Sequence, residues 1–267
     1  MADSISRRTF LAAGPALAAL PLQTAAPAQS PPITDFFPAQ PAELVKEVVG
    51  VSHGNIDRLK QLVDARPALA KAAWDWGFGD WESAIDAASH VGNRPIAEYL
   101  MSKGARPTLF TAAMMGQLDV VKGAIAMAPG IQRNRGPHGI TLLAHARFGG
   151  DKAVDVLKFL ESLGDADPVY APVALTAADK LALSGVYVFG PGANDRFEVT
   201  EDKRGFPSIL RPGGTTRALI HLGSMQFHPI GADAVRITFE MAEGRAAALT
   251  VHDPEVVVTA KRSGTTL

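Results

Sequence analysis

The stretch Ser83–Pro107, SAIDAASHVGNRPIAEYLMSKGARP, predicts a complete unit of two helices joined by a short loop. Its first half is rich in alanine, and small side chains allow a helix to lie close to its neighbours. Gly92 provides a turn with positive φ between the two helices without steric cost, and Gly104 ends the second helix. The start, the turn and the stop of the unit are therefore all present in one segment.

The same stretch resembles an ankyrin repeat. The usual pattern of that family is T-P-L-H-x-A-A-x-x-G-H, then a second helix with x-x-I-V-x-Y-L-L, then x-x-G-A-x-P. Asp86 takes the place of the usual histidine. The positions that match are Ser83, Ala84, Ile85, Asp86, Ala88, Gly92, Asn93, Ile96, Ala97, Tyr99, Leu100, Met101, Gly104, Ala105 and Pro107.

Further glycines indicate more units of this kind, and the segment 139–151, GITLLAHARFGGD, is the second-best match. The resemblance implies a multidomain α plus β protein that begins with an ankyrin-repeat α-solenoid of about four repeats over residues 42–167. Apolar faces at helical spacing would then stack into one continuous core. The glycines expected in the turn of each unit are Gly54, Gly92, Gly116 and Gly150. They are 38, 24 and 34 residues apart, whereas the ankyrin period is about 33 residues.

After a linker at residues 168–182, apolar and polar residues alternate with a period of two over residues 183–263. Short strands separated by glycine and proline turns favour an antiparallel β-meander or small barrel. The pattern of short alternating strands in this part resembles the lipocalin-like β domain appended to many exported bacterial hydrolases. The predicted strands are Val186–Phe189, Arg196–Glu201, Pro207–Leu210, Arg217–His221, Met225–His228, Ala234–Met241, Arg245–His252 and Val256–Lys261.

Residues 1–28 have the features of a targeting segment. The run SRRTFL at residues 6–11 precedes an apolar stretch that ends at Leu22, and Ala26-Pro27-Ala28 offers small residues for cleavage. The segment resembles a bacterial twin-arginine translocation signal, which implies export to the periplasm in a folded state. The apolar run is about a dozen residues long, whereas a membrane span needs about 20, so a short anchor is disfavoured and no stable membrane insertion is expected after cleavage. A proline-rich leader follows at residues 29–41.

Composition excludes several kinds of chemistry. The chain has 267 residues, a formal net charge of −1 and no cysteine, so disulfides, thiolate nucleophiles and cysteine-bound zinc are ruled out. It contains no G-x-S-x-G or S-x-x-K motif, and the glycine-rich segment 212–216 lacks the ending of a phosphate-binding loop. We therefore predict no catalytic residues, no cofactor and no nucleic-acid partner.

The histidines at 53, 90, 138 and 145 show no metal-ligand spacing with a second histidine. Asp86 and His90 are four residues apart, which more often gives a hydrogen bond on a helix surface than a metal or acid–base pair. We therefore predict no metal site. His145 follows the position of the usual histidine of the ankyrin pattern and is a candidate contact in the groove of the repeats.

Two segments between the predicted repeats are candidate partner-binding sites. The first, WDWGFGDW, contains Trp74, Trp76, Phe78 and Trp81, which would anchor a partner or fold down to cap the first repeat. The second, QRNRGPHG at residues 132–139, carries charged side chains that would meet an acidic partner or stay solvated. Its candidate residues are Arg133, Arg135 and His138.

These observations predict a non-catalytic periplasmic interaction scaffold that binds another exported protein through the concave face of an ankyrin stack. The alternative is small-ligand binding or hydrolase-like activity in a pocket formed by the C-terminal β domain against the repeats. Core packing is the competing explanation for the rings that would line such a pocket, which are Tyr187, Phe197, Phe227 and Phe239. The oligomeric state stays open.

Overall fold

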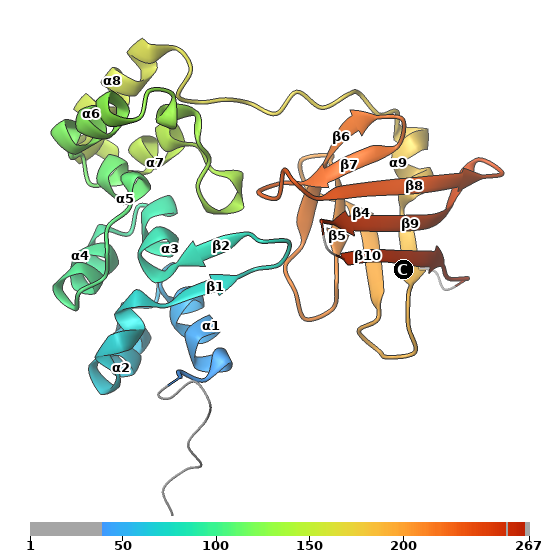
Figure 1. The fold of residues 1–267 in the computed structure, drawn as a ribbon, viewed down its shortest axis with the longest axis horizontal. Coiled ribbons are helices and arrows are strands. Elements are labelled where there is room, and N and C mark those ends of the chain that lie inside the picture. The colour runs from blue at the N-terminus through green and yellow to red at the C-terminus, as the bar shows by residue number, and fades with distance from the viewer. Residues whose placement is uncertain (1–38, 255, 265–267) are drawn as a thin grey trace, which may run out of the picture. The chain divides into compact units, whose positions relative to one another are not determined.

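The computed structural model describes residues 39–254 and 256–264, and this part of the chain contains nine α-helices (Figure 1). The helices are α1 (Ala42–Val51), α2 (Ile56–Ala65), α3 (Ala84–His90), α4 (Arg94–Ser102), α5 (Leu109–Met114), α6 (Leu118–Met127), α7 (Leu142–Phe148), α8 (Val154–Leu163) and α9 (Ala177–Leu183). Four short 3-10 helices lie between them, namely η1 (Pro67–Lys71), η2 (Ile131–Arg133), η3 (Pro137–Gly139) and η4 (Gly150–Ala153).

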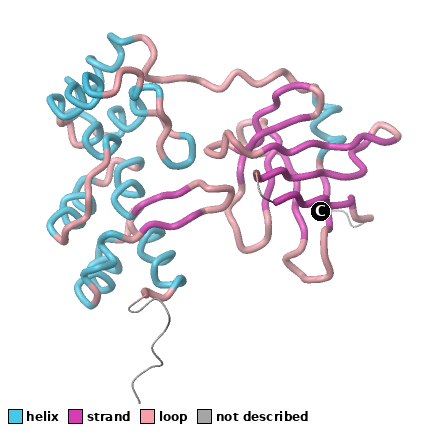
Figure 2. Tube along the Cα trace, viewed as in Figure 1, coloured by secondary structure: helices cyan, strands magenta, loops and turns pink. Residues whose placement is uncertain are grey.

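Two short strands interrupt the helices, and eight more follow them, as the colours of Figure 2 show. The early pair consists of β1 (Ala73–Asp75) and β2 (Trp81–Ser83). The later strands are β3 (Gly185–Val188), β4 (Arg196–Glu201), β5 (Pro207–Leu210), β6 (Arg217–Gly223), β7 (Gln226–Pro229), β8 (Arg236–Ala242), β9 (Arg245–Asp253) and β10 (Val256–Arg262).

The local structure of the stretch quoted first agrees with its sequence. Ser83 caps α3, since its side-chain oxygen accepts a hydrogen bond from the backbone N–H of Asp86 at 3.2 Å. Gly92 follows the helix with a φ of 71°, and a Cβ at this position would lie 2.3 Å from the carbonyl oxygen of Phe148. Only glycine fits both conditions. Gly104 likewise has a positive φ, 88°, just after the end of α4.

The predicted ankyrin-repeat solenoid over residues 42–167 is nevertheless wrong. The helices of this region are short, from six residues in α5 to ten in α1, and scattered, and no repeat solenoid is evident among the described residues. The predicted continuous core is also replaced by two clusters. One, mostly from α1 to α4, contains Leu59 and Leu100, and the other, from α5 to α8, contains Leu142 and Leu160.

The segments between the helix pairs explain this difference. A β-hairpin follows the first pair, whereas the loop after α6 contains two 3-10 helices, so successive units do not have the same structure. A solenoid needs equivalent units that stack on one another. Glycines of positive φ at 92, 116 and 150 fix local reversals of the chain, whereas Gly54 does not have a positive φ, and such turns do not make neighbouring reversals equivalent.

The hairpin of β1 and β2 pairs antiparallel, with Trp74 opposite Glu82. Its tip has three consecutive residues of positive φ, 105° at Gly77, 61° at Phe78 and 75° at Gly79. A phenylalanine in this conformation is uncommon. The side chain of Phe78 packs against the hydrophobic core of the barrel, and this burial stabilises the unusual backbone.

Strands β3 to β10 form a closed antiparallel barrel in the order β10-β3-β4-β5-β6-β7-β8-β9. Each of the eight predicted strands is present within two residues of its predicted ends, because inward apolar residues alternate with outward polar ones. The pairing of Arg262 with Tyr187 closes the barrel between β10 and β3. Helices and barrel belong to one compact unit, residues 40–267.

Three of the four rings considered as a pocket lining form the core of the barrel, whereas Phe197 also lines a pocket together with Trp76 and Phe78 of the hairpin. Tyr187 and Phe227 are 0% exposed, and Phe239 lies between them with ring centroids at 5.8 and 5.4 Å. Phe197 belongs to the same hydrophobic cluster. Among the described residues, no helix has the length and apolar character needed to cross a membrane.

Candidate metal centre

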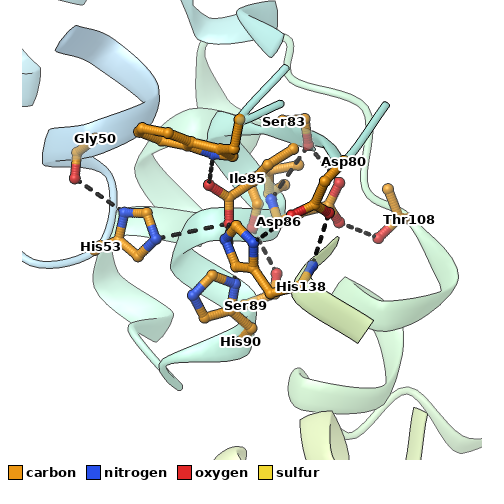
Figure 3. A network of polar contacts seen from close by, with 12 residues as sticks. Gly50, His53, Asp80, Ser83, Ile85, Asp86, Ser89, His90, Thr108 and His138 are labelled. Carbon is orange, nitrogen blue, oxygen red and sulfur yellow. Dashed lines mark hydrogen bonds and ion pairs between the residues drawn. The ribbon is translucent and has the colours of Figure 1, made fainter. Parts of the chain in front are cut away.

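Three histidines and one glutamate meet in the helical region. His53, Glu82, His90 and His138 each offer one possible ligand atom, and these four atoms all lie within 4.8 Å of one another. Figure 3 shows the imidazoles of His53, His90 and His138 close together, with Asp80 next to His138. Imidazole nitrogen and carboxylate oxygen are common ligands of divalent transition-metal ions.

The four residues come from separate elements. His53 lies in the turn between α1 and α2, and Glu82 lies in β2. The Ser83 cap starts α3 directly after β2, so this helix carries the chain from Glu82 to His90 at its end. His138 is in η3 with a φ of 60°, the left-handed region that residues other than glycine rarely adopt. Such strained residues concentrate at functional sites.

One carboxylate oxygen is the centre of the cluster. Oε1 of Glu82 lies 3.0 Å from Nδ1 of His90, 3.2 Å from Nε2 of His138 and 3.6 Å from Nε2 of His53. Four ligands bound at about 2.0–2.1 Å to a tetrahedral zinc ion would lie about 3.3 Å apart. The observed distances from the carboxylate are therefore close to those that such an ion imposes.

Contacts outside the cluster orient its ligands. Nδ1 of His53 lies 2.9 Å from the carbonyl oxygen of Gly50, which can only accept, so Nδ1 carries the hydrogen and Nε2 keeps its lone pair. Trp76 donates its indole N–H to Oε2 of Glu82 at 2.7 Å and thereby leaves Oε1 to the cluster. Histidine ligands of metals usually have such a partner on the second ring nitrogen.

Asp80 orients His138 in the same way but with two contacts. Its Oδ1 accepts the backbone N–H of His138 at 2.8 Å, and its Oδ2 lies 2.7 Å from Nδ1 of the ring. A carboxylate paired with one ring nitrogen fixes the other as the ligand atom and makes it more basic. His138 therefore presents Nε2 to the cluster.

Two buried atoms of the cluster have no hydrogen-bond partner. Oε1 of Glu82 and Nδ1 of His90 are close to one another, yet neither makes a hydrogen bond within the described residues. The two side chains are only 0% and 8% exposed. Buried polar atoms without a partner are rare because each is costly. A cation placed between them would satisfy both.

The charges in the cluster are strongly coupled. Burial alone would raise the pKa of the Glu82 carboxyl, but the imidazoles of His138 and His90 outweigh burial and lower that pKa to about 2. Burial alone would lower the pKa of His138, but the contacts with Asp80 and Glu82 raise it to about 9. In the absence of an ion, a protonated His138 therefore bridges two carboxylates. A divalent cation can take over that bridging role at the Glu82 side.

The aromatic residues predicted to bind a partner are mostly engaged within the chain. Trp76 bonds Glu82, and Phe78 packs into the barrel core. Trp74 is partly buried against the first helical cluster, as capping of the helices would require. Trp81 differs, because it is 63% exposed.

The candidate residues of the second segment, together with His145, also make contacts within the chain. Arg133 forms an exposed ion pair with Asp165 at 2.8 Å, and the Arg135 guanidinium lies 3.7 Å from the centroid of the Tyr170 ring. His138 belongs to the metal centre, and His145 is fully buried. The predicted partner-binding role of these residues stays a prediction, and the concave repeat surface on which it relied is not evident among the described residues.

Sequence reasoning did not find the cluster. Asp86, which was weighed as a partner of His90, instead bonds the hydroxyl groups of Ser83 and Thr108 at 2.6 Å each. The three histidines are far apart in the chain, and Glu82 stands alone among tryptophans. One signal was present, since each histidine lies within two residues of a turn glycine, in the runs HG, HVG and HG.

A scan against models of known protein families finds no match to this chain, and a search of curated proteins finds no significant match. The function of the cluster is therefore inferred from its geometry.

Proposed function

We propose that the protein binds a divalent transition-metal ion such as Zn²⁺ through His53, Glu82, His90 and His138. The observation that carries this proposal is the pair of buried, unpartnered atoms on Glu82 and His90, 3.0 Å apart. The contacts on His53, His138 and Glu82 support it, because each engages one atom of the side chain outside the cluster and leaves the other for the ion.

A cluster of ion pairs without a metal explains less. A protonated His138 would bond Asp80 and Glu82, but Nδ1 of His90, although it lies 3.0 Å from Oε1 of Glu82, would still be buried without a hydrogen bond within the described residues. The donor set selects the class of ion. Three nitrogens and one oxygen suit zinc, iron, nickel or copper(II) better than calcium or magnesium, which prefer oxygen ligands.

The bound ion would join three distant parts of the helical region. It would connect the turn after α1, the β2 strand with α3, and the η3 loop. The His53 and His138 side chains are 33% and 25% exposed, so solvent reaches the cluster from their side. The ion would therefore hold the hairpin in place and also be accessible to a further small ligand such as water.

Zinc binding to matched variants tests this proposal. Competition with a chromophoric chelator, together with elemental analysis after dialysis, would give the affinity and the stoichiometry. We expect one zinc ion per wild-type chain and a loss of affinity of at least about 100-fold in His90→Gln, because it removes a ligand rather than an outer partner. His252→Gln, an exposed histidine of β9, is the matched control and should bind like the wild type.

Two results would contradict the proposal. The first is wild-type protein that retains no zinc after exposure to a stoichiometric excess. The second is a folded His90→Gln variant with wild-type affinity. Glu82→Gln, which keeps the shape of the side chain and removes its charge, should also lose affinity, and it separates a metal site from a neutral hydrogen-bonded cluster.

We also propose that this metal protein is exported to the bacterial periplasm. The support is the twin-arginine pattern around Arg7 and Arg8, which lies outside the described residues. Since that pathway carries folded cargo, the ion would be inserted before export. Cell fractionation should find the wild type in the periplasm and an Arg7→Lys, Arg8→Lys variant in the cytoplasm, and equal distribution of the two would contradict export.

A further inference from the structure

One arginine of the barrel reaches the outer side of the proposed metal centre. Arg217, the first residue of β6, is 3% exposed, and its Nη1 forms an ion pair with Oδ2 of Asp80. The same Nη1 lies 3.2 Å from Nδ1 of His138. Its Nε and Nη2 make no hydrogen bond within the described residues. A buried guanidinium is costly unless it is paired, so the pairing with Asp80 is the contact that retains it.

The contact with Asp80 bears directly on the histidine ligand. A guanidinium has only donor groups, so Arg217 cannot accept the hydrogen of His138 Nδ1. That hydrogen goes to Oδ2 of Asp80, which Nη1 of Arg217 also contacts, while Oδ1 of Asp80 accepts the backbone N–H of His138. Arg217 therefore holds Asp80 in position to orient the ring.

The hairpin of β1 and β2 connects the contact between Arg217 and Asp80 to the cluster. It carries Glu82, a member of the cluster, and Trp76, whose indole N–H bonds Glu82. The backbone N–H of Trp76 also donates to the carbonyl oxygen of Asp80 at 3.1 Å. Phe78, between them, packs into the barrel core. The hairpin that presents a metal ligand is thus held by the barrel at two points, an apolar contact at its tip and an ion pair at Asp80.

We infer that Arg217 is a positioning residue of the metal centre and acts through Asp80 on His138. This inference rests on the proposed function. It assigns to the barrel a part in metal binding, because one of its strands supplies the residue that aligns a ligand from outside the cluster. Substitutions of such outer residues typically reduce metal affinity about 10- to 100-fold.

Arg217→Met tests the inference in the full-length protein. The variant keeps a long side chain and removes the charge and the donors. We expect zinc affinity to fall about 10- to 100-fold and the visible absorption bands of bound Co²⁺ to shift, since the His138 ring loses its alignment. Arg217→Lys keeps the charge but not the forked geometry and should recover part of the affinity.

The matched control is Arg211→Met, because Arg211 belongs to the same barrel, is 57% exposed and does not contact Asp80 within the described residues. Its zinc affinity and Co²⁺ spectrum should equal those of the wild type. Circular dichroism and thermal unfolding in a chelator would show whether each variant folds without metal. Absorption bands report ligand geometry, which a merely structural substitution elsewhere would leave unchanged.

The possible outcomes separate the two proposals. Wild type that binds no metal defeats the proposed function, and the role of Arg217 with it. Wild type that binds zinc beside a folded Arg217→Met variant of equal affinity and spectrum overturns the inference alone. If Arg217→Met does not fold, Asp80→Asn decides the question. Since Arg217 acts only through Asp80, wild-type affinity in Asp80→Asn would also overturn the inference, and a loss would support it.

Discussion

The barrel and the helical region bury different kinds of side chain. In the barrel core, rings of Phe227 and Phe239 pack edge to face, and the one hydroxyl among the core rings, on Tyr187, donates to the Leu183 carbonyl at 2.5 Å. In the helical region, Glu82 and His90 are buried with unpartnered atoms. Unpaired buried polar atoms oppose folding in both regions, since His221 and Arg217 of the barrel also carry them, but within the described residues the candidate metal-ligand atoms gather in the cluster around Glu82.

This contrast also separates the two regions by role. The rings of Tyr187, Phe227 and Phe239 pack against one another, so this part of the barrel contributes stability, and Arg217 contributes a contact to Asp80. The cluster around Glu82 contains ionisable groups with two buried atoms that make no hydrogen bond within the described residues, and the proposed ion would satisfy both. Substitutions on the two sides should therefore differ in whether they change stability, metal affinity or both.

The largest effect is expected from the barrel core. Phe227→Ala removes a side chain that is 0% exposed and should lower the free energy of unfolding by about 3–5 kcal/mol, through lost burial and a cavity. Chemical denaturation would measure this loss. Zinc affinity of the folded fraction should not change. The exposed Leu222→Ala on β6 is the control, and a loss in Phe227→Ala no greater than in this control would contradict the assignment of the barrel as the stabilising core.

Metal binding should have the next largest effect. Zinc at about 1,000 times its dissociation constant should raise the free energy of unfolding by about 4 kcal/mol, because the ion binds the folded state alone. Thermal unfolding with and without a chelator would show the increase. Phe227→Ala should keep this increase and His90→Gln should lose it. An equal increase in both variants would mean that zinc binds elsewhere.

A third test concerns a buried histidine outside the cluster. Burial lowers the pKa of His145 to about 4, and its Nδ1 lies 2.8 Å from the Thr141 carbonyl oxygen. The unfolded chain, with a histidine pKa near 6.5, binds this proton first as the pH falls. Stability should therefore decrease between about pH 6.5 and pH 4, by on the order of 3 kcal/mol from this group.

His145→Gln removes the group that titrates and should make the unfolding free energy less dependent on pH in that window. His252→Gln, on the exposed side of the barrel, is the control and should keep the wild-type dependence. The comparison uses the slope against pH, because replacing a buried side chain also changes the absolute stability. Identical slopes in wild type and His145→Gln would show that protonation of this buried, neutral histidine does not cause the loss of stability at low pH.

The eight barrel strands could be predicted from sequence because strand structure depends on local alternation. Ile237 and Phe239, for example, face the core two residues apart, and turn glycines such as Gly244, with a φ of 76°, separate the strands. The turns at Gly92, Gly116 and Gly150 were equally local, with φ of 71°, 75° and 61°. Whether such turns produce a solenoid depends on how units pack, and a single chain does not encode that relation in its glycine spacing.

The metal centre could not be predicted in this way. His53, His90 and His138 are separated by tens of residues, so no fixed spacing relates them. Their meeting depends on the hairpin, which the sequence analysis treated only as a segment between predicted repeats, and on the η3 loop that bonds Asp80. Glu82 looked like one acidic residue in an aromatic run, and its importance comes from its tertiary contacts alone.

The smallest effect on stability is expected at Trp81, and this residue provides the remaining test of the predicted partner-binding segment. Trp81 is 63% exposed, whereas Trp74, Trp76 and Phe78 pack within the chain. Trp81→Ser should change the free energy of unfolding by no more than about 0.5 kcal/mol and leave zinc affinity intact. If the segment contacts another exported protein, a periplasmic pull-down with this variant should lose that protein, since the exposed ring is the one free to touch it. Recovery equal to that of the wild type would exclude the aromatic segment as the contact and leave the hairpin with its role at the metal centre.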